Sequence, residues 1–66
     1  MLYAERSVRR VVIRTEAKMM VREFNVDHNV VGVQISGDST TDATVAIAMD
    51  NGRTCLYKSS GMLLRK

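Results

Sequence analysis

The sequence predicts an α+β fold, one helix packed on a small antiparallel sheet within a single domain of residues 1–66. Three observations lead to this prediction. An Asn-Gly pair, Asn51-Gly52, lies between two β-prone runs, apolar residues alternate upstream of it, and apolar residues recur at helical spacing between Ile13 and Phe24. Asn-Gly is a strong hairpin signal because both residues tolerate positive φ.

The N-terminal third has two possible interpretations. From residue 13 onward the apolar residues follow the helical period, at Ile13, Ala17, Met20, Val21 and Phe24. Upstream the phase breaks, and four of the six residues 8–13 are β-branched, which favours a strand. We expect a strand over about 7–14 followed by a helix over about 15–25. One continuous helix over about 5–25 is the alternative.

The C-terminal half predicts a three-stranded antiparallel meander. Its expected strands cover about 30–36, 43–50 and 53–58. A two-residue turn at Asn51-Gly52 would pair Ala48 with Cys55. Upstream, a register that faces Ile35 to Val45 and Val31 to Met49 gathers the apolar side chains on one face, which the helix would cover. A slip of one residue would exchange the two faces.

The second face of this sheet predicts self-association. A chain of 66 residues buries only about 60% of its unfolded surface, so small domains of this size usually need a disulfide, a metal or a partner. One cysteine and one histidine supply neither a disulfide nor a zinc site, and we expect no metal and no cofactor. We therefore expect a homodimer through the mildly apolar second face, formed by Gly32, Gln34, Ala46, Ala48, Cys55 and Tyr57.

The formal charge excess lies in residues 1–24, which carry +3, whereas the charges of residues 25–66 cancel. Its cations are Arg6, Arg9, Arg10, Arg14, Lys18 and Arg22. Arginine suits phosphate contacts because its guanidinium donates two parallel hydrogen bonds. We expect a small non-catalytic nucleic-acid-binding or regulatory protein that uses this segment. The alternative is a protein-interaction module, such as an inhibitor or adaptor, that docks on an acidic surface. The simplest interpretation of these six cations is a charged face in contact with solvent.

Other chemistry finds little support. Cys55 and His28 have no third residue at a recognisable spacing to orient them, and we expect no enzyme and no small-molecule substrate. The acids Asp38, Asp42 and Asp50 are typical turn residues. The longest apolar run, 45–49, is too short to span a bilayer, and no signal-peptide pattern is present. We expect a cytoplasmic protein without a membrane partner.

Overall fold

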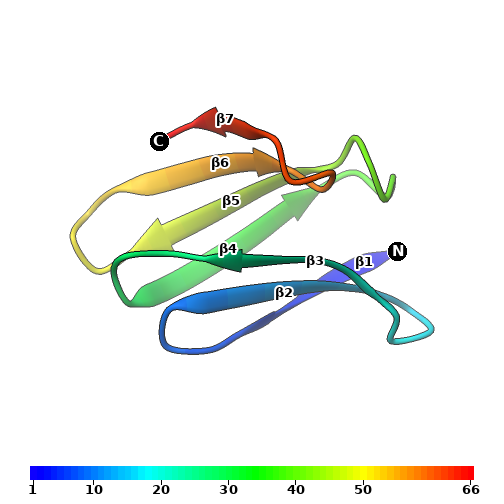
Figure 1. The fold of residues 1–66 in the computed structure, drawn as a ribbon, viewed down its shortest axis with the longest axis horizontal. Coiled ribbons are helices and arrows are strands. Elements are labelled where there is room, and N and C mark those ends of the chain that lie inside the picture. The colour runs from blue at the N-terminus through cyan, green and yellow to red at the C-terminus, as the bar shows by residue number, and fades with distance from the viewer.

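The computed structural model describes residues 1–66 as an all-β protein with seven antiparallel strands and no helix. The first sheet contains β1 (Leu2–Arg6), β2 (Arg10–Thr15) and β3 (Met20–Asn25), in that order. The second sheet contains β4 (Val30–Ser36), β5 (Thr44–Met49), β6 (Thr54–Lys58) and β7 (Leu63–Arg65), in that order. The two sheets face each other as a sandwich (Figure 1). The predicted α+β class is therefore wrong.

The segment expected to be a helix, residues 15–25, is a tight turn followed by β3. The Thr15 N–H donates to the Met19 carbonyl at 3.0 Å, and the Lys18 N–H donates to the Thr15 carbonyl at 2.8 Å. Lys18 has a φ of +66°, which reverses the chain instead of continuing a helix. These contacts bring β3 alongside β2, so that the neighbouring strand supplies the hydrogen-bond partners that a helix would have found within itself.

The apolar stripe that predicted the helix is divided between different environments. Ile13 and Phe24 are buried in the core, from adjacent strands, whereas Ala17 lies exposed in the turn and Met20 is 60% exposed. Helix propensity is a weak preference that tertiary burial overrides. The helical period was misleading because strands β2 and β3, paired side by side, also bring Ile13 and Phe24 into one core.

The alternative helix over 5–25 is also wrong, whereas the strand expected over about 7–14 is present as β2, which begins three residues later at Arg10. Residues 7–9 form a turn between β1 and β2, closed by a hydrogen bond from the Ser7 N–H to the Arg10 carbonyl at 2.8 Å. The register then pairs Arg6 with Val11 and Ala4 with Ile13. The N-terminal third is a β-meander of its own.

The C-terminal strands β4, β5 and β6 lie close to the expected ranges, which were 30–36, 43–50 and 53–58. They form an antiparallel meander to which β7 adds a fourth strand, and Ile35 faces Val45 as expected. Val31 does not face Met49, because the register shifts between β4 and β5 and places Val30 opposite Met49. Val31 is consequently 56% exposed.

The β5–β6 turn contains three residues instead of the expected two. The Met49 N–H donates to the Arg53 carbonyl at 2.9 Å, and the Gly52 N–H donates to the Met49 carbonyl at 3.1 Å. Gly52 has a φ of +83°, the left-handed conformation that three-residue hairpins require. Asn51 accepts a hydrogen bond from the Arg53 N–H through its side-chain oxygen at 3.0 Å.

The longer turn shifts the register of β6 by one residue and exchanges its two faces. Ile47 faces Cys55, and Ala46 faces Leu56. Cys55 is 5% exposed in the core, and Tyr57 packs against the core beside it. The six residues expected to form one self-association face are therefore separated, with Gly32, Gln34, Ala46 and Ala48 on the outer face of the second sheet and Cys55 and Tyr57 on its inner face.

A substitution at Gly52 tests this turn. We expect Gly52→Ala to lower the free energy of unfolding by about 1 kcal/mol, because an alanine side chain disfavours positive φ. No atom lies within 4 Å of a Cβ added there, so crowding contributes nothing. Asparagine tolerates this conformation, and Gly52→Asn should cost less. Urea unfolding of the three proteins measures the difference; equal losses for the two variants would contradict the turn assignment.

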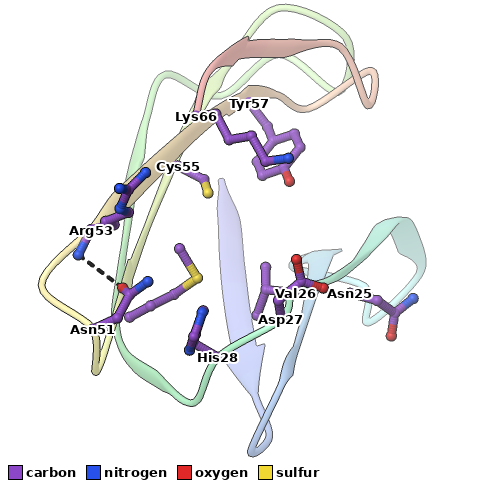
Figure 2. Close-up of a pocket in the computed structure, with 10 residues that line it drawn as sticks. Asn25, Val26, Asp27, His28, Asn51, Arg53, Cys55, Tyr57 and Lys66 are labelled. Atoms are coloured by element: carbon purple, nitrogen blue, oxygen red, sulfur yellow. Dashed lines mark hydrogen bonds between the residues drawn. The ribbon is translucent and has the colours of Figure 1, made fainter.

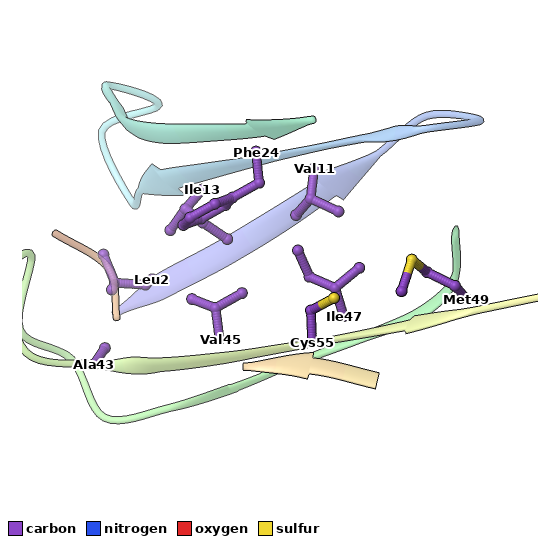
Figure 3. Packing of buried hydrophobic residues seen from close by; sticks show 9 residues of the cluster. All are labelled: Leu2, Val11, Ile13, Phe24, Ala43, Val45, Ile47, Met49 and Cys55. Atoms are coloured by element: carbon purple, nitrogen blue, oxygen red, sulfur yellow. The ribbon is translucent and has the colours of Figure 1, made fainter. Parts of the chain in front are cut away.

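The core lies between the two sheets and is small. Its nine buried apolar residues are Leu2, Val11, Ile13, Phe24, Ala43, Val45, Ile47, Met49 and Cys55 (Figure 3). Ser59 is the one buried polar residue. Such a limited core agrees with the marginal stability expected of a chain this short. The homodimer expected on that ground stays a prediction.

The two sides of the sandwich differ. On one side β1 packs beside β4, whereas no comparable packing joins β3 to β7 on the other. Phe24 in β3 stacks on Tyr57 in β6, with ring centroids 4.5 Å apart, so β3 lies over β6. Because three strands face four, β7 has no strand opposite it. We call this side, between β3 and β7, the open side.

Candidate functional site

A cleft of about 490 Å³ opens on the open side of the sandwich (Figure 2). Its floor is apolar and comes from the second sheet, with Met49, Cys55 and Tyr57. The linker between the sheets contributes Val26, Asp27 and His28. The remaining lining residues are Asn25, Asn51, Arg53 and Lys66. An apolar floor with a few polar groups around it is typical of binding sites.

The linker that carries Asp27 and His28 is held by backbone hydrogen bonds at both ends. These tie it to the β1–β2 turn and to the β5–β6 turn: Val26 N–H to the Arg9 carbonyl at 3.0 Å, Val30 N–H to the Val8 carbonyl at 2.8 Å, and Asp50 N–H to the Asn29 carbonyl at 2.9 Å. The Arg9 guanidinium also donates to the Asn29 side-chain oxygen at 3.2 Å. One wall of the cleft is thus held in place by two other parts of the chain, the β1–β2 turn and the β5–β6 turn.

Tyr57 is the most perturbed group in the cleft. Burial raises the pKa of its hydroxyl above the ordinary value of 10.0, and the negative charges of Cys55 and Asp27 raise it further. Its ring stacks on Phe24 at an interplanar angle of 37°. The phenol therefore stays neutral and available as a hydrogen-bond donor well into the alkaline range.

The raised pKa of Tyr57 predicts how the free energy of unfolding changes with pH in the alkaline range. Because the folded protein holds the Tyr57 proton more tightly than the unfolded chain does, its contribution is fully present below about pH 10. It is lost as the pH rises through the raised pKa of the folded state. We expect Tyr57→Phe, which keeps the stacking on Phe24, to reduce this alkaline loss. Thermal unfolding of both proteins from about pH 9 to 11 measures it; identical pH profiles would contradict the assignment.

The cations around the cleft have no acidic partners. No acid lies within 4.0 Å of the side-chain nitrogens of Arg53 or Lys66. The same holds for Arg22 in β3, whose guanidinium lies over Gly61 in the β6–β7 turn. A Cβ added at Gly61 would lie 3.1 Å from the Arg22 Nε. Three uncompensated cations therefore border the open side.

Two of the predicted basic residues are neutralised on the outer face of the first sheet. Arg10 pairs with Glu23 at 3.0 Å, and Arg14 pairs with Glu5. Arg14 also donates to the Lys18 carbonyl at 3.1 Å. Both pairs join neighbouring strands across the sheet. Binding of phosphate here would compete with acids that are already in place.

The other four predicted cations lie in separate places. Arg6 borders a shallow groove of about 530 Å³ between β1 and β4, and Arg9 lies in the β1–β2 turn. Lys18 lies in the β2–β3 turn, and Arg22 lies at the edge of the first sheet above Gly61. The six cations expected to form one binding surface are thus distributed over two faces and two turns, and only Arg22 borders the open side.

Cys55 and His28 both line the cleft, although they are distant in sequence. The His28 Nδ1 lies 3.9 Å from the Asp50 Oδ1, and no hydrogen bond joins His28 to Cys55. No three His, Cys, Asp or Glu side chains gather as a metal-binding group. The absence of catalysis stays a prediction.

The structure contains no helix long and apolar enough to cross a membrane.

Sequence reasoning missed the contribution of Arg53 and Lys66. Their charges cancel formally against the acids of residues 25–66, so net charge does not single them out. The register of β6 is the signal that places Arg53 at the cleft. Cys55 faces inward in this register, and Arg53, two residues earlier, lies on the same side of the strand. That register depends on choosing a three-residue turn at Gly52, and the Asn-Gly pair favours two.

Comparisons of the chain with protein-family models, with curated proteins and with solved structures find no match. The function is therefore inferred from the cleft, its cations and the strand edges beside it.

Proposed function

We propose that this protein is a non-catalytic protein-interaction module that binds an acidic partner at the open side of its sandwich. One observation carries the proposal: the cleft combines an apolar floor with cations that have no acidic partner, and it lies between two free strand edges. Apolar contact supplies the affinity of such a site, and its charges select the partner.

The free edges support binding of a protein partner. β3 ends the first sheet and β7 ends the second, so both carry unpaired backbone groups. Exposed apolar side chains accompany them, with Met20 at 60%, Met62 at 58%, Leu63 at 49% and Leu64 at 46% exposure. Isolated exposed apolar residues are ordinary, but a group beside an uncovered edge favours pairing with another chain.

The charges support an acidic partner. Arg22, Arg53 and Lys66 border the open side without counterions, while Arg10 and Arg14 have theirs. An acidic surface that docks at the cleft would compensate the first three without breaking an existing ion pair. Phosphate contacts with Arg10 and Arg14, on the outer face of the first sheet, would compete with their ion pairs to Glu23 and Glu5.

A selection experiment tests this proposal. Peptides selected from a random display library for binding to the folded protein should be rich in acids and should shift the amide NMR signals of Cys55, Tyr57 and Asp27. Arg53→Glu should weaken their binding by about tenfold, whereas Arg65→Glu, an equal charge change on the outer face of β7, should not. Selected peptides that leave the cleft signals unchanged would contradict the proposal.

A labelled random-sequence DNA duplex tests the competing hypothesis in the same assay. If the six N-terminal cations neutralised six phosphates, log Kd would change with log salt with a slope of about 5. Binding of that kind, abolished by Arg10→Glu with Arg14→Glu and unaffected by Arg53→Glu, would replace the proposal.

A further inference from the structure

We propose that the partner contributes an extended segment that pairs with β3 and becomes the fourth strand of the first sheet. Its inward side chains would be carboxylate, apolar and carboxylate, at alternate positions. This inference rests on the proposed function, since it specifies the partner for the same open side.

The mismatch between the sheets creates the place for this strand. The first sheet has three strands and the second has four. With β1 beside β4 and β3 over β6, the unmatched position lies next to β3 and opposite β7. A strand paired with β3 would lie about 4.8 Å from it and about 10 Å above the second sheet, the ordinary spacings of a sandwich. We call this position the strand gap.

The inner walls of the strand gap place cations at both ends and aromatic rings between them. Arg22 lies above Gly61, in the turn that follows β6. Arg53 lies at the other end, directly before β6, and lines the cleft. Phe24 and Tyr57 stack between these ends. Lys66 adds a second cation on the cleft side (Figure 2).

These walls determine the pattern of the segment. Side chains that face one side of a strand are two residues apart, so a carboxylate, an apolar residue and a second carboxylate occupy positions i, i+2 and i+4. Positions i and i+4 lie about 13 Å apart, the length of a five-residue strand such as β6. The carboxylates then reach Arg22 and Arg53, while the apolar side chain covers Tyr57 and the exposed Leu63.

Two synthetic peptides of equal composition test the pattern. Acetyl-Thr-Glu-Thr-Val-Thr-Glu-Thr-amide presents Glu, Val and Glu on one face. Acetyl-Thr-Thr-Glu-Val-Glu-Thr-Thr-amide presents Val and the two acids on opposite faces. We expect the first to bind at least tenfold more tightly than the second, measured by NMR titration. Lys in place of both Glu residues should abolish binding of the first peptide.

Backbone pairing has its own readout. Binding of the first peptide should slow hydrogen exchange of β3 amides whose N–H groups are free in the unbound protein. N-methylation of the peptide at alternate residues should abolish binding, while methylation at the intervening residues should not. Arg22→Glu and Arg53→Glu should each weaken binding about tenfold, and Arg65→Glu should change it less than twofold.

Four results would overturn the inference. Equal affinity of the two peptides, or tight binding without protection of β3, would exclude strand addition but leave the proposed function standing if the cleft signals shift. Sedimentation as a dimer, with β3 protected in the absence of peptide, would assign the strand gap to a second copy of the chain. Cleft signals that respond to neither these peptides nor the selected ones would overturn the proposed function as well.

Discussion

Replacing Ile13 with alanine is expected to lower the free energy of unfolding by about 3 kcal/mol. Ile13 is fully buried between the two sheets, where its neighbours come from separate strands and cannot collapse fully into the space left behind. A domain of 66 residues has a total stability on the order of 3–10 kcal/mol. The variant should therefore lose much of its stability, which urea unfolding monitored by far-ultraviolet circular dichroism measures.

Met20→Ala provides the matched control. Met20 shares the apolar helical stripe with Ile13 in the sequence, but in the structure its side chain is 60% exposed at the edge of the first sheet. We expect a change within about 0.5 kcal/mol, as for other surface positions. A helix packed on the sheet would bury both residues on one face. Similar losses for the two variants would therefore contradict the two-sheet architecture.

Ser59→Ala is expected to cost about 2 kcal/mol although it removes a single oxygen. Ser59 is 1% exposed, and its Oγ donates to the Ser39 carbonyl at 2.9 Å and accepts from the Ala43 N–H at 3.1 Å. Alanine would leave both backbone groups without this partner, and the Ala43 N–H would lose it in a buried site. Desolvation without a replacement hydrogen bond accounts for the loss.

The neighbouring Ser60→Ala serves as the comparison, because Ser60 is partly exposed and its side chain makes no hydrogen bond within the protein. We expect it to change stability little. Hydrogen exchange gives a local check, since the Ala43 amide should exchange faster in Ser59→Ala than in Ser60→Ala. Equal unfolding midpoints for the two variants would show that the buried hydroxyl does not join the β4–β5 loop to the β6–β7 turn.

The C-terminal meander was largely predictable because its signals are local. Alternating apolar residues before Gly37 and the Asn51-Gly52 pair indicate strands and a turn without reference to the rest of the chain. The turn length was not predictable from that pair, since two-residue and three-residue hairpins both accept Gly52 at positive φ. The difference of one residue moved Cys55 and Tyr57 to the inner face.

The N-terminal third was not predictable because its local signals conflict. Its helix-forming residues, Glu16 to Glu23, and its apolar spacing favour a helix. Burial of Ile13 and Phe24 against the second sheet favours strands, and tertiary packing decides between the two. The prediction that the six N-terminal cations form one surface was wrong for the same reason. In the structure these cations lie on strands and turns, where Arg10 and Arg14 pair with acids on neighbouring strands.

The sequence by itself determined three strands of the C-terminal half, β4, β5 and β6, and the position of the turn between β5 and β6. It also determined a small core and an N-terminal excess of cations. Only the tertiary structure decided which cations lack partners and where a cleft opens. The physical reason is that a strand exposes its side chains to whichever sheet lies opposite. The open side exists because three strands cover four, a relation between distant segments that no local pattern contains.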